Sequence, residues 1–310
     1  MRTDETWRHE PLEEMNRLEK IRGDHVSGAT EIAIRCAEYL RDEAESIAID
    51  RPETFFSRLT EVGTELKEAQ PAMAPVHNAV HSVLTAVSRH LEKGGTSAQL
   101  RTTATQTAQN FINHIKCSLE DLSKEGFTIM QGKRSVMTYS SSRAVAALLK
   151  HVWMKGLRFA VVVPESRPMS EGRLLARDLG SVGVPCTIIV DGAVSAFLEE
   201  VDVVLVGADR VSEHWAINKI GTRGLAIMAR AFRVPIYCAC ETSKFLCADR
   251  LPFTQKEMPT DEIWKTAYDN VTIRNLYFEK IPLDSFTGFI TEKGIVGIED
   301  VRRIMTEASA

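Results

Sequence analysis

The sequence predicts an α/β protein in which a helical N-terminal domain precedes a domain with a parallel sheet. Up to about Gly126 the apolar residues recur at helical spacing, and no strand-like run interrupts them. After Lys133, short β-branched runs alternate with helical segments, which is the pattern of βαβ units. We therefore expect a helical domain over residues 1–126 and a parallel-sheet domain over residues 127–310.

The helical part is expected to contain four main helices. Each carries apolar residues on one face, and a Gly-Gly pair at Gly94 breaks the chain before the last of them. The predicted helices are Gly28–Asp50, Pro52–Lys67, Pro75–Lys93 and Ser97–Glu125.

The second part is expected to form a doubly wound sheet with right-handed crossovers. Several of its strands are apolar throughout, as expected when helices cover both faces. The predicted strands are Ser135–Tyr139, Phe159–Pro164, Cys186–Val190, Asp202–Val206 and Pro235–Ala239, with Asn275–Phe278 and Phe289–Thr291 as candidate late strands. The predicted helices between them are Ser142–Lys150, Glu171–Leu179, Val194–Glu199 and Thr222–Ala231.

Composition narrows the function classes. The net charge of −4 argues against a nucleic-acid groove, which usually needs a basic excess. The six cysteines contain no C-x-x-C pair, and the first 20 residues lack the apolar stretch of a secretory signal. No apolar run is long enough to cross a bilayer. We expect a cytoplasmic protein with reduced thiols that contacts neither membrane nor nucleic acid directly.

In a parallel sheet, ligands bind beyond the carboxyl ends of the strands. The first such loop holds Ser140, Ser141, Ser142 and Arg143, directly before a predicted helix. Free N–H groups at a helix N-terminus favour an anion, and three hydroxyls with an arginine favour phosphate over a plain serine cap.

Later loops add further candidates. Arg167 could bind a phosphate or carboxylate, or could pair with a neighbouring acid. Asp209 ends an apolar strand, where it could act as acid and base, bind sugar hydroxyls or cap a helix. Asn218 and Lys219 are read as the next loop, and Lys244 follows another strand as a second phosphate contact.

Common cofactor motifs are absent. The sequence has neither the P-loop pattern nor G-x-G-x-x-G. His77 and His81 share a helix face, but no H-E-x-x-H surrounds them, so a packed or solvated pair is the simpler interpretation. We expect neither a cofactor nor a metal.

The run from Gly207 to Phe245 (GADRVSEHWAINKIGTRGLAIMARAFRVPIYCACETSKF) is distinctive. With TYSSSRAVAALLK and PESRPMSEGRLLARDLGSVGVPCTIIVDGA, it resembles the family of the α, β and δ subunits of translation initiation factor 2B. That family also includes methylthioribose-1-phosphate isomerase and ribose-1,5-bisphosphate isomerase. The resemblance covers nearly the whole chain and implies a Rossmann-like second domain and a homodimer or larger homo-oligomer.

The resemblance also implies roles for single residues. Asp209 matches the catalytic Asp of the isomerases, the family's Asn-Lys pair falls on Asn218 and Lys219, and its later phosphate lysine falls on Lys244. The segment IRGDHVSGATEIA resembles the Arg-Gly-Ala helix start, with Gly28 and Ala29 in place.

Three positions depart from the isomerases. Ser140 stands where they carry the catalytic Cys, and Ser27 and Gln70 stand where they carry arginines. A thiol with a pKa near ~8.5 can be tuned into a base, whereas a serine hydroxyl needs a helper.

Three functions stay open. The departures favour a family member that binds a phosphorylated sugar or a nucleoside monophosphate without the usual catalytic Cys. The first alternative is an aldose–ketose isomerase of a 1-phosphorylated sugar, in which His25 or Tyr139 would have to assist Ser140. The second alternative is a regulatory subunit of a translation-factor assembly.

Overall fold

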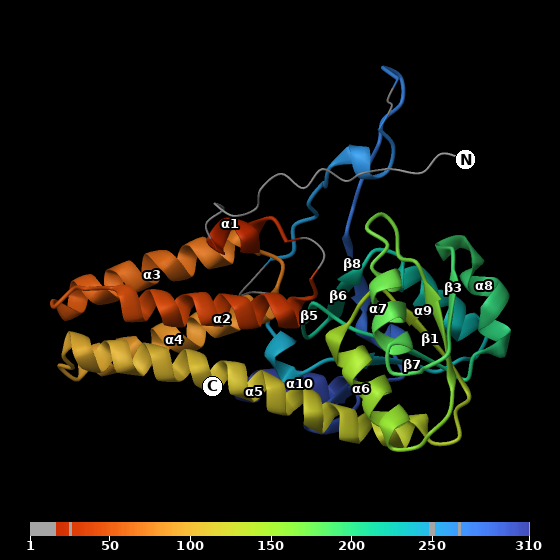
Figure 1. The fold of residues 1–310 in the computed structure, drawn as a ribbon, viewed down its shortest axis with the longest axis horizontal. Helices are drawn as coiled ribbons and strands as arrows, with labels where there is room; N and C mark the ends of the chain where they lie inside the picture. Colours follow the sequence, from red (N-terminus) through yellow and green to blue (C-terminus); the bar gives the residue numbers. More distant parts are fainter. Residues whose placement is uncertain (1–16, 25–26, 248–251, 266–267, 310) are drawn as a thin grey trace.

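A computed structural model describes residues 17–24, 27–247, 252–265 and 268–309. The chain begins with helices only, which confirms the helical pattern (Figure 1). They are α1 (Arg17–Arg22), α2 (Ala29–Ser46), α3 (Pro52–Ala69), α4 (Ala74–Glu92) and α5 (Ser97–Met130).

Local chemistry sets where these helices begin. Pro52 stands at the first position of α3, where its fixed φ suits a helix and its missing N–H costs nothing. Thr96 and Gln99 form a capping box that starts α5. Helix α5 has 34 residues and runs from the other helices to the sheet, where it packs against α6 (Figure 1). Because α5 continues past residue 126 to Met130, the division into two domains there stays a prediction.

The main sheet has seven strands in the order β10-β9-β7-β4-β1-β2-β3, and β10 alone runs antiparallel. The parallel, doubly wound arrangement is therefore confirmed. The strands are β1 (Ser135–Tyr139), β2 (Ala160–Pro164), β3 (Cys186–Ile189), β4 (Val203–Val206), β7 (Ile236–Ala239), β9 (Gly288–Thr291) and β10 (Gly294–Val296). The helices that follow or cover them are α6 (Arg143–Met154), α7 (Gly172–Gly180), α8 (Val194–Phe197), α9 (Thr222–Ala231) and α10 (Ile298–Ser309).

A second, three-stranded antiparallel sheet was not predicted. It consists of β5 (Arg210–Val211), β6 (Trp215–Lys219) and β8 (Phe278–Pro282). Asn218 and Lys219 therefore lie on a strand rather than in the predicted loop. The segment WAINK mixes polar and apolar residues, and it is held extended by pairing with β5 just before it and with β8 much later in the chain.

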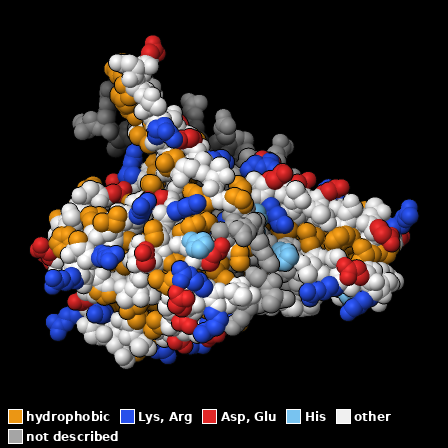
Figure 2. Space-filling model, turned by 180° about the vertical axis from the view of Figure 1, so that it is seen from behind, with side chains coloured by type: hydrophobic (Ala, Val, Ile, Leu, Met, Phe, Trp, Pro, Cys, Tyr) orange, Lys and Arg blue, Asp and Glu red, His pale blue; other side chains and the backbone are white. Residues whose placement is uncertain are grey.

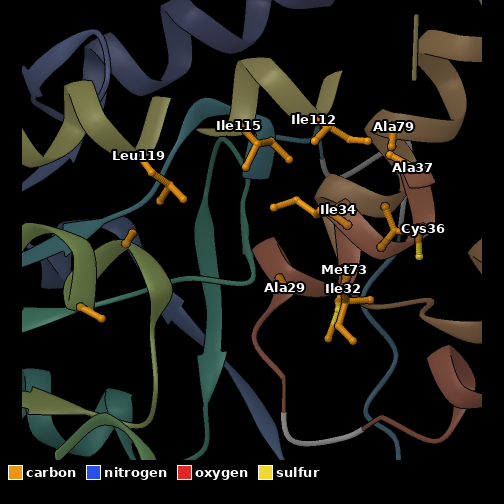
Figure 3. Packing of buried hydrophobic residues seen from close by; sticks show 14 of the residues in the cluster. Ala29, Ile32, Ile34, Cys36, Ala37, Met73, Ala79, Ile112, Ile115 and Leu119 are labelled. Carbon is orange, nitrogen blue, oxygen red and sulfur yellow. The ribbon is translucent and has the colours of Figure 1, made fainter. Parts of the chain in front are cut away.

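The hydrophobic core covers both faces of the main sheet. Val136 packs with the helical part, while its neighbour Met137 packs with the opposite cluster, because successive side chains of a strand point to opposite faces. Figure 3 shows Ile112, Ile115 and Leu119 from α5 within the first cluster, near residues of α2. This continuous packing holds the start of α2 against the carboxyl ends of the sheet strands.

One segment projects from the body of the molecule. It lies between β7 and β8 and includes a short 3₁₀ turn at Thr260–Glu262 (Figure 1). Its exposed apolar side chains include Ile263, Trp264 and Tyr268, and Figure 2 shows hydrophobic surface along it from behind. Among the helices that the structure describes, none combines the length and apolar character that a membrane span requires.

Candidate functional site

A cavity of about 370 Å³ lies between the carboxyl ends of the sheet strands and the N-termini of α2 and α6. The structure brings nearly all predicted site residues to its lining, although they come from distant parts of the chain. The predicted residues that line it are Ser27, Gly28, Ala29, Gln70, Ser140, Ser141, Ser142, Arg143, Asp209, Asn218, Lys219 and Lys244.

Two sides of this cavity differ in character. We call Glu171, Asp209, Asn218, Lys219 and Lys244 the sheet wall, because they lie at or near the ends of strands. We call the opposite side, with Asp24, Ser27, Gln70 and Arg143, the helix wall, and we include Arg35, which is bonded to Ser27 behind the lining. Ser140, at the end of β1, lies at the sheet edge as well.

Asp209 lies just after β4 and faces the cavity. Its backbone N–H donates to Ile217 O at 2.9 Å, which fixes the turn into β5. Its carboxylate accepts the N–H of Ala29, the first residue of α2. Burial raises the pKa of Asp209, although Lys244 and Lys219 oppose the shift. A raised pKa makes a carboxyl a better proton acceptor, which suits an acid and base.

Lys219 and Glu171 form a buried ion pair. The ammonium of Lys219 also lies 4.4 Å from the centroid of the Tyr277 ring. Burial raises the pKa of Glu171, while Lys219 opposes that shift and Asp209 adds to it. The Oε2 atom of Glu171 is buried and has no hydrogen-bond partner within the described part of the chain.

Lys244 belongs to a second buried ion pair, with Glu241. Its Nζ lies 3.7 Å from Glu241 Oε2, and the hydroxyl of Thr30 donates to the other carboxylate oxygen at 2.7 Å. Burial disfavours the charged lysine, but Glu241 and Asp209 outweigh that effect, so the pKa of Lys244 is raised. Lys244 therefore stays cationic and can attract an anion.

Asn218 is held in place by the turn that follows it. Its Nδ2 donates to the hydroxyl of Thr222 at 3.0 Å, and that hydroxyl donates to Lys219 O at 2.7 Å. Gly221 between them has φ of 101°, and a Cβ there would lie 2.1 Å from the Tyr139 hydroxyl oxygen. Only glycine fits this turn, which brings the start of α9 against β1.

On the helix wall, Arg35 takes up the position next to Ser27. Its Nη2 donates to Ser27 Oγ at 2.7 Å, and its Nη1 lies 2.8 Å from Asp24 Oδ2. Gln70 donates from Nε2 to Ile21 O at 2.6 Å and to Asp24 O at 3.1 Å. Gln70 thus ties the end of α3 to the segment before α2, and both of these hydrogen bonds use its amide donor.

Ser142 and Arg143 begin α6. Ser142 Oγ accepts the N–H of Val145 at 3.4 Å, which is the capping role that the sequence left open. Arg143 pairs with Glu31 in the first turn of α2 and is half exposed. Arg143 lines the cavity. Glu31 also pairs with Arg35, so the two arginines lie near each other.

Ser140 occupies a strained backbone position at the end of β1. Its φ is 62°, which a non-glycine residue rarely adopts, and its N–H donates to Ser166 Oγ at 2.7 Å. Of its two expected helpers, the Tyr139 hydroxyl pairs with Asp191 instead. His25 lies outside the described residues.

Arg167 is the one predicted site residue that does not line the cavity. Asp191 accepts the N–H groups of Ser166 and Arg167 at 2.8 and 2.7 Å, which turns this loop toward β3. The Arg167 guanidinium donates to Glu262 O at 3.3 Å.

Sequence reasoning missed Glu171, which lines the cavity, and also Arg35 and Glu241, which contact residues of the lining. Glu171 directly precedes α7 in a loop beyond β2, so its place at a strand end was a usable signal. Arg35 lies one turn after Glu31 on the same helix face, which the helical period could have indicated. Glu241 is the residue three before Lys244, directly after β7.

A family model for the initiation factor 2 subunit family matches residues 25–297. The chain belongs to this family. The ribose 1,5-bisphosphate isomerase of Archaeoglobus fulgidus is 32% identical over 303 residues, which cover 95% of this chain and 93% of the relative. The enzyme of the same name from Methanocaldococcus jannaschii is 29% identical over 90% of this chain and 89% of its own length.

Solved structures of the family share the fold. The translation initiation factor eIF-2B of Pyrococcus horikoshii superposes with a TM-score of 0.77 at 26% identity, covering 92% of this chain and 97% of that one. The 5-methylthioribose 1-phosphate isomerase of the same organism has a TM-score of 0.76 at 21% identity, over 94% and 87% of the two chains. The α/β architecture of the family is therefore that of this chain.

Proposed function

We propose that this chain is an isomerase that interconverts the aldose and ketose forms of a phosphorylated sugar. The observation that carries the proposal is the meeting of two carboxyls of raised pKa, Asp209 and Glu171, with two buried lysines in one cavity. Relatives at about 30% identity over nine-tenths of the chain are named ribose 1,5-bisphosphate isomerases, which supports this choice of reaction.

The charges of the cavity suit a sugar that carries phosphate. Lys219 and Lys244 supply buried cations, and the positive dipole ends at the starts of α2 and α6 favour anions. Arg143 and Arg35 add cationic charge at the mouth. The two arginines that the family resemblance places at Ser27 and Gln70 are missing, and Arg35 next to Ser27 offsets one of those losses.

Asp209 is proposed to act as acid and base at oxygen. Aldose–ketose isomerisation needs a proton delivered to the ring oxygen when the sugar opens, and later a proton removed from the hydroxyl on C2. The raised pKa of Asp209 fits this exchange. Asn218, held by Thr222, is placed to orient sugar hydroxyls.

A second candidate function is binding without turnover. It is favoured by Ser140, which replaces the thiol of the isomerases and has no general base as a hydrogen-bond partner within the described residues. In that case the cavity would bind a phosphorylated sugar or a nucleoside monophosphate as a regulatory ligand.

One experiment separates the two candidates. Purified protein is incubated with ribose 1,5-bisphosphate, and formation of the ketose bisphosphate is followed by NMR while binding is measured by calorimetry. Turnover that Asp209→Asn abolishes supports the isomerase. Binding with no turnover of this sugar or of methylthioribose 1-phosphate would reject the isomerase and support the regulatory function.

We also propose that the chain forms a homo-oligomer. The apolar side chains of the projecting segment are exposed in the single chain, and a second copy of the chain could cover them. Light scattering after gel filtration should give a mass above 34.6 kDa. A monomer at micromolar concentration would contradict this proposal.

A further inference from the structure

We propose that Glu171 is the base that carries the proton between C2 and C1 of the sugar. This inference rests on the isomerase function proposed above. It gives a role to a residue that the family resemblance does not single out, and it answers how the reaction proceeds with Ser140 in the position of the thiol.

The reaction needs two separate proton carriers. One proton moves between oxygens, from the C2 hydroxyl to the ring oxygen, and the other moves between carbons, from C2 to C1. A single carboxyl at Asp209 cannot hold both protons at once. Ser140 is a poor second carrier, because a serine hydroxyl is a far weaker base than a thiolate and this one has no described partner to activate it.

Glu171 has the required position. It lines the same cavity as Asp209, and the charge of Asp209 is close enough to influence its ionisation. The residue is only 4% exposed, so little water reaches its side chain. Water-poor surroundings strengthen a carboxylate base, because hydration no longer stabilises its charge.

The two oxygens of Glu171 have different surroundings. Oε1 pairs with Lys219, whereas Oε2 is buried without a hydrogen-bond partner among the described residues. An orphaned buried carboxylate oxygen is costly and calls for an explanation. The Glu171 carboxylate accepts one backbone hydrogen bond, from its own N–H, as the Asp209 carboxylate does from Ala29. A proton taken from the substrate would occupy the acceptor position that Oε2 leaves unused.

The backbone fixes Glu171 at this place. A Cβ on the next residue, Gly172, would lie 2.0 Å from Pro164 O, so only glycine lets the chain approach the end of β2 so closely. The N–H of Gly172 donates to Glu165 O at 3.1 Å. Such a firm anchor suits a catalytic base, whose reach must be accurate to a fraction of an ångström.

The environments of the two carboxyls also suit complementary roles. Burial raises the pKa of each, and the charge of Asp209 adds to the rise at Glu171. An acid and a base that work together need one protonated and one ionised carboxyl, and we propose that Asp209 and Glu171 take these two roles.

The proposed sequence of steps is balanced. Protonated Asp209 gives its proton to the ring oxygen as the bond from C1 to that oxygen breaks. Ionised Glu171 removes the proton from C2, and the electron pair forms the C1–C2 double bond of an enol. Asp209 then takes the proton of the C2 hydroxyl while Glu171 returns its proton to C1. The ketone at C2 results, and both carboxyls regain their starting states.

The test compares Glu171→Gln and Glu171→Asp with the wild-type protein, using ribose 1,5-bisphosphate as the probe. Glutamine keeps the size of the side chain and an acceptor for Lys219, so folding should survive, and a melting curve checks this. We expect Glu171→Gln to bind the probe within about threefold of wild type and to lose at least ~100-fold in kcat. Glu171→Asp should restore part of kcat, with an altered acid limb of its pH–rate profile.

Glu165→Gln is the matched control. Glu165 lies on the same loop and pairs with Arg173 at 2.7 Å, but it does not line the cavity. This variant should keep kcat within about twofold of wild type. With probe deuterated at C2, the wild-type product should carry that deuterium at C1, because Glu171 returns the proton that it removed. Glu171→Gln should fail to break the bond between C2 and deuterium.

The outcomes separate the two proposals. If the wild-type protein turns over and Glu171→Gln keeps more than a tenth of its kcat, Glu171 is not the base although the isomerase function stands. If the wild-type protein binds the probe without turnover and without breaking the bond between C2 and deuterium, the isomerase function fails and the role of Glu171 fails with it. Loss of probe binding in Glu171→Gln at an unchanged melting temperature would reduce Glu171 to a partner of Lys219 and overturn its role as base.

Discussion

The two walls of the cavity hold charges in different ways. On the sheet wall, Lys219 and Lys244 are almost fully buried, and each is paired with a buried glutamate. On the helix wall, Arg35 and Arg143 pair with carboxylates whose side chains remain partly exposed. Charges interact strongly where water is excluded and weakly where it enters. The sheet wall is therefore suited to chemistry and the helix wall to attracting and orienting an anion.

This contrast also fits where the chain departs from the isomerases it resembles. The sheet wall keeps the Asp, the Asn-Lys pair and the later lysine at Asp209, Asn218, Lys219 and Lys244. Two of the departures, Ser27 and Gln70, fall on the helix wall, and the third, Ser140, is an uncharged side chain at the end of β1. Changes there alter contacts with the ligand without leaving a buried charge unpaired, whereas changes on the sheet wall would do both.

The largest effect is expected from Lys219→Met. Removing one partner of a buried ion pair leaves Glu171 with an uncompensated charge, which should lower the free energy of unfolding by about 3–5 kcal/mol. Urea denaturation measures this, and binding of ribose 1,5-bisphosphate should be lost as well. Adding Glu171→Leu should recover most of the stability without restoring binding.

Lys150→Met is the control for this change. Lys150 pairs with Asp178 on the surface, where both side chains are partly exposed, so the loss should stay below about 1 kcal/mol. If the two lysine variants lose the same free energy of unfolding, the buried ion pair of the sheet wall is no stronger than a surface pair.

The next prediction concerns the missing thiol. In the Glu171→Gln background, Ser140→Cys should raise kcat by at least ~10-fold, because a thiol at the end of β1 offers a second base facing the cavity. In the wild-type background the same change should raise kcat less, since Glu171 already acts as the base. Steady-state kinetics on ribose 1,5-bisphosphate tests both. Equal gains in the two backgrounds would mean that the introduced thiol and Glu171 do not share a task.

Some parts of the fold and site could be read from the sequence because they depend on local pattern. Strand β1 and helix α9 have the bounds predicted for them, since apolar runs and turn residues mark both ends. Strand β6 has no alternating pattern of its own, and its pairing with the distant β8 cannot be predicted from local sequence. For the same reason local pattern predicts a loop, not a strand, at Asn218 and Lys219.

The position of a residue after a strand predicts its place in the cavity correctly for Asp209 and wrongly for Arg167. Both closely follow sheet strands, so the topology places both near the same edge. Asp209 reaches the cavity, whereas Asp191 captures the N–H groups beside Arg167 and turns that loop away. Glu171 reaches the cavity because Gly172 packs against the backbone of β2, a close approach that spacing alone does not reveal.

The helix wall should respond more mildly than the sheet wall. Arg35→Met removes a partly exposed cation next to Ser27, so KM for ribose 1,5-bisphosphate should rise about 3- to 10-fold with kcat nearly unchanged. Arg58→Met, which removes an exposed arginine paired with Glu61 on α3, is the matched control and should leave KM unchanged. A fall in kcat without a rise in KM for Arg35→Met would assign this wall a part in the chemistry.

The smallest effect, and the one that tests the dry character of the sheet wall most directly, is the pH dependence of stability at Asp209. Its pKa is raised in the folded chain above the usual 3.8, so the folded chain binds this proton more tightly than the unfolded chain does. The folded chain therefore loses stability as the pH rises from about 4 to the folded pKa. Asn cannot ionise, so the stability of Asp209→Asn relative to wild type should increase over that range and then level off.

For Asp202→Asn we expect the opposite change of stability with pH. The N–H groups of Arg134 and Ser135 lower the pKa of Asp202 below 3.8, so wild type gains stability from this carboxylate as the pH rises toward 4. Relative to wild type, Asp202→Asn should therefore become less stable over that lower range and stay constant above it. Urea denaturation at half-unit steps between about pH 3 and pH 8 measures both variants. If the difference in free energy of unfolding between Asp209→Asn and wild type does not change with pH, water reaches this carboxyl freely. The contrast between the two walls would then rest on the lysine pairs alone.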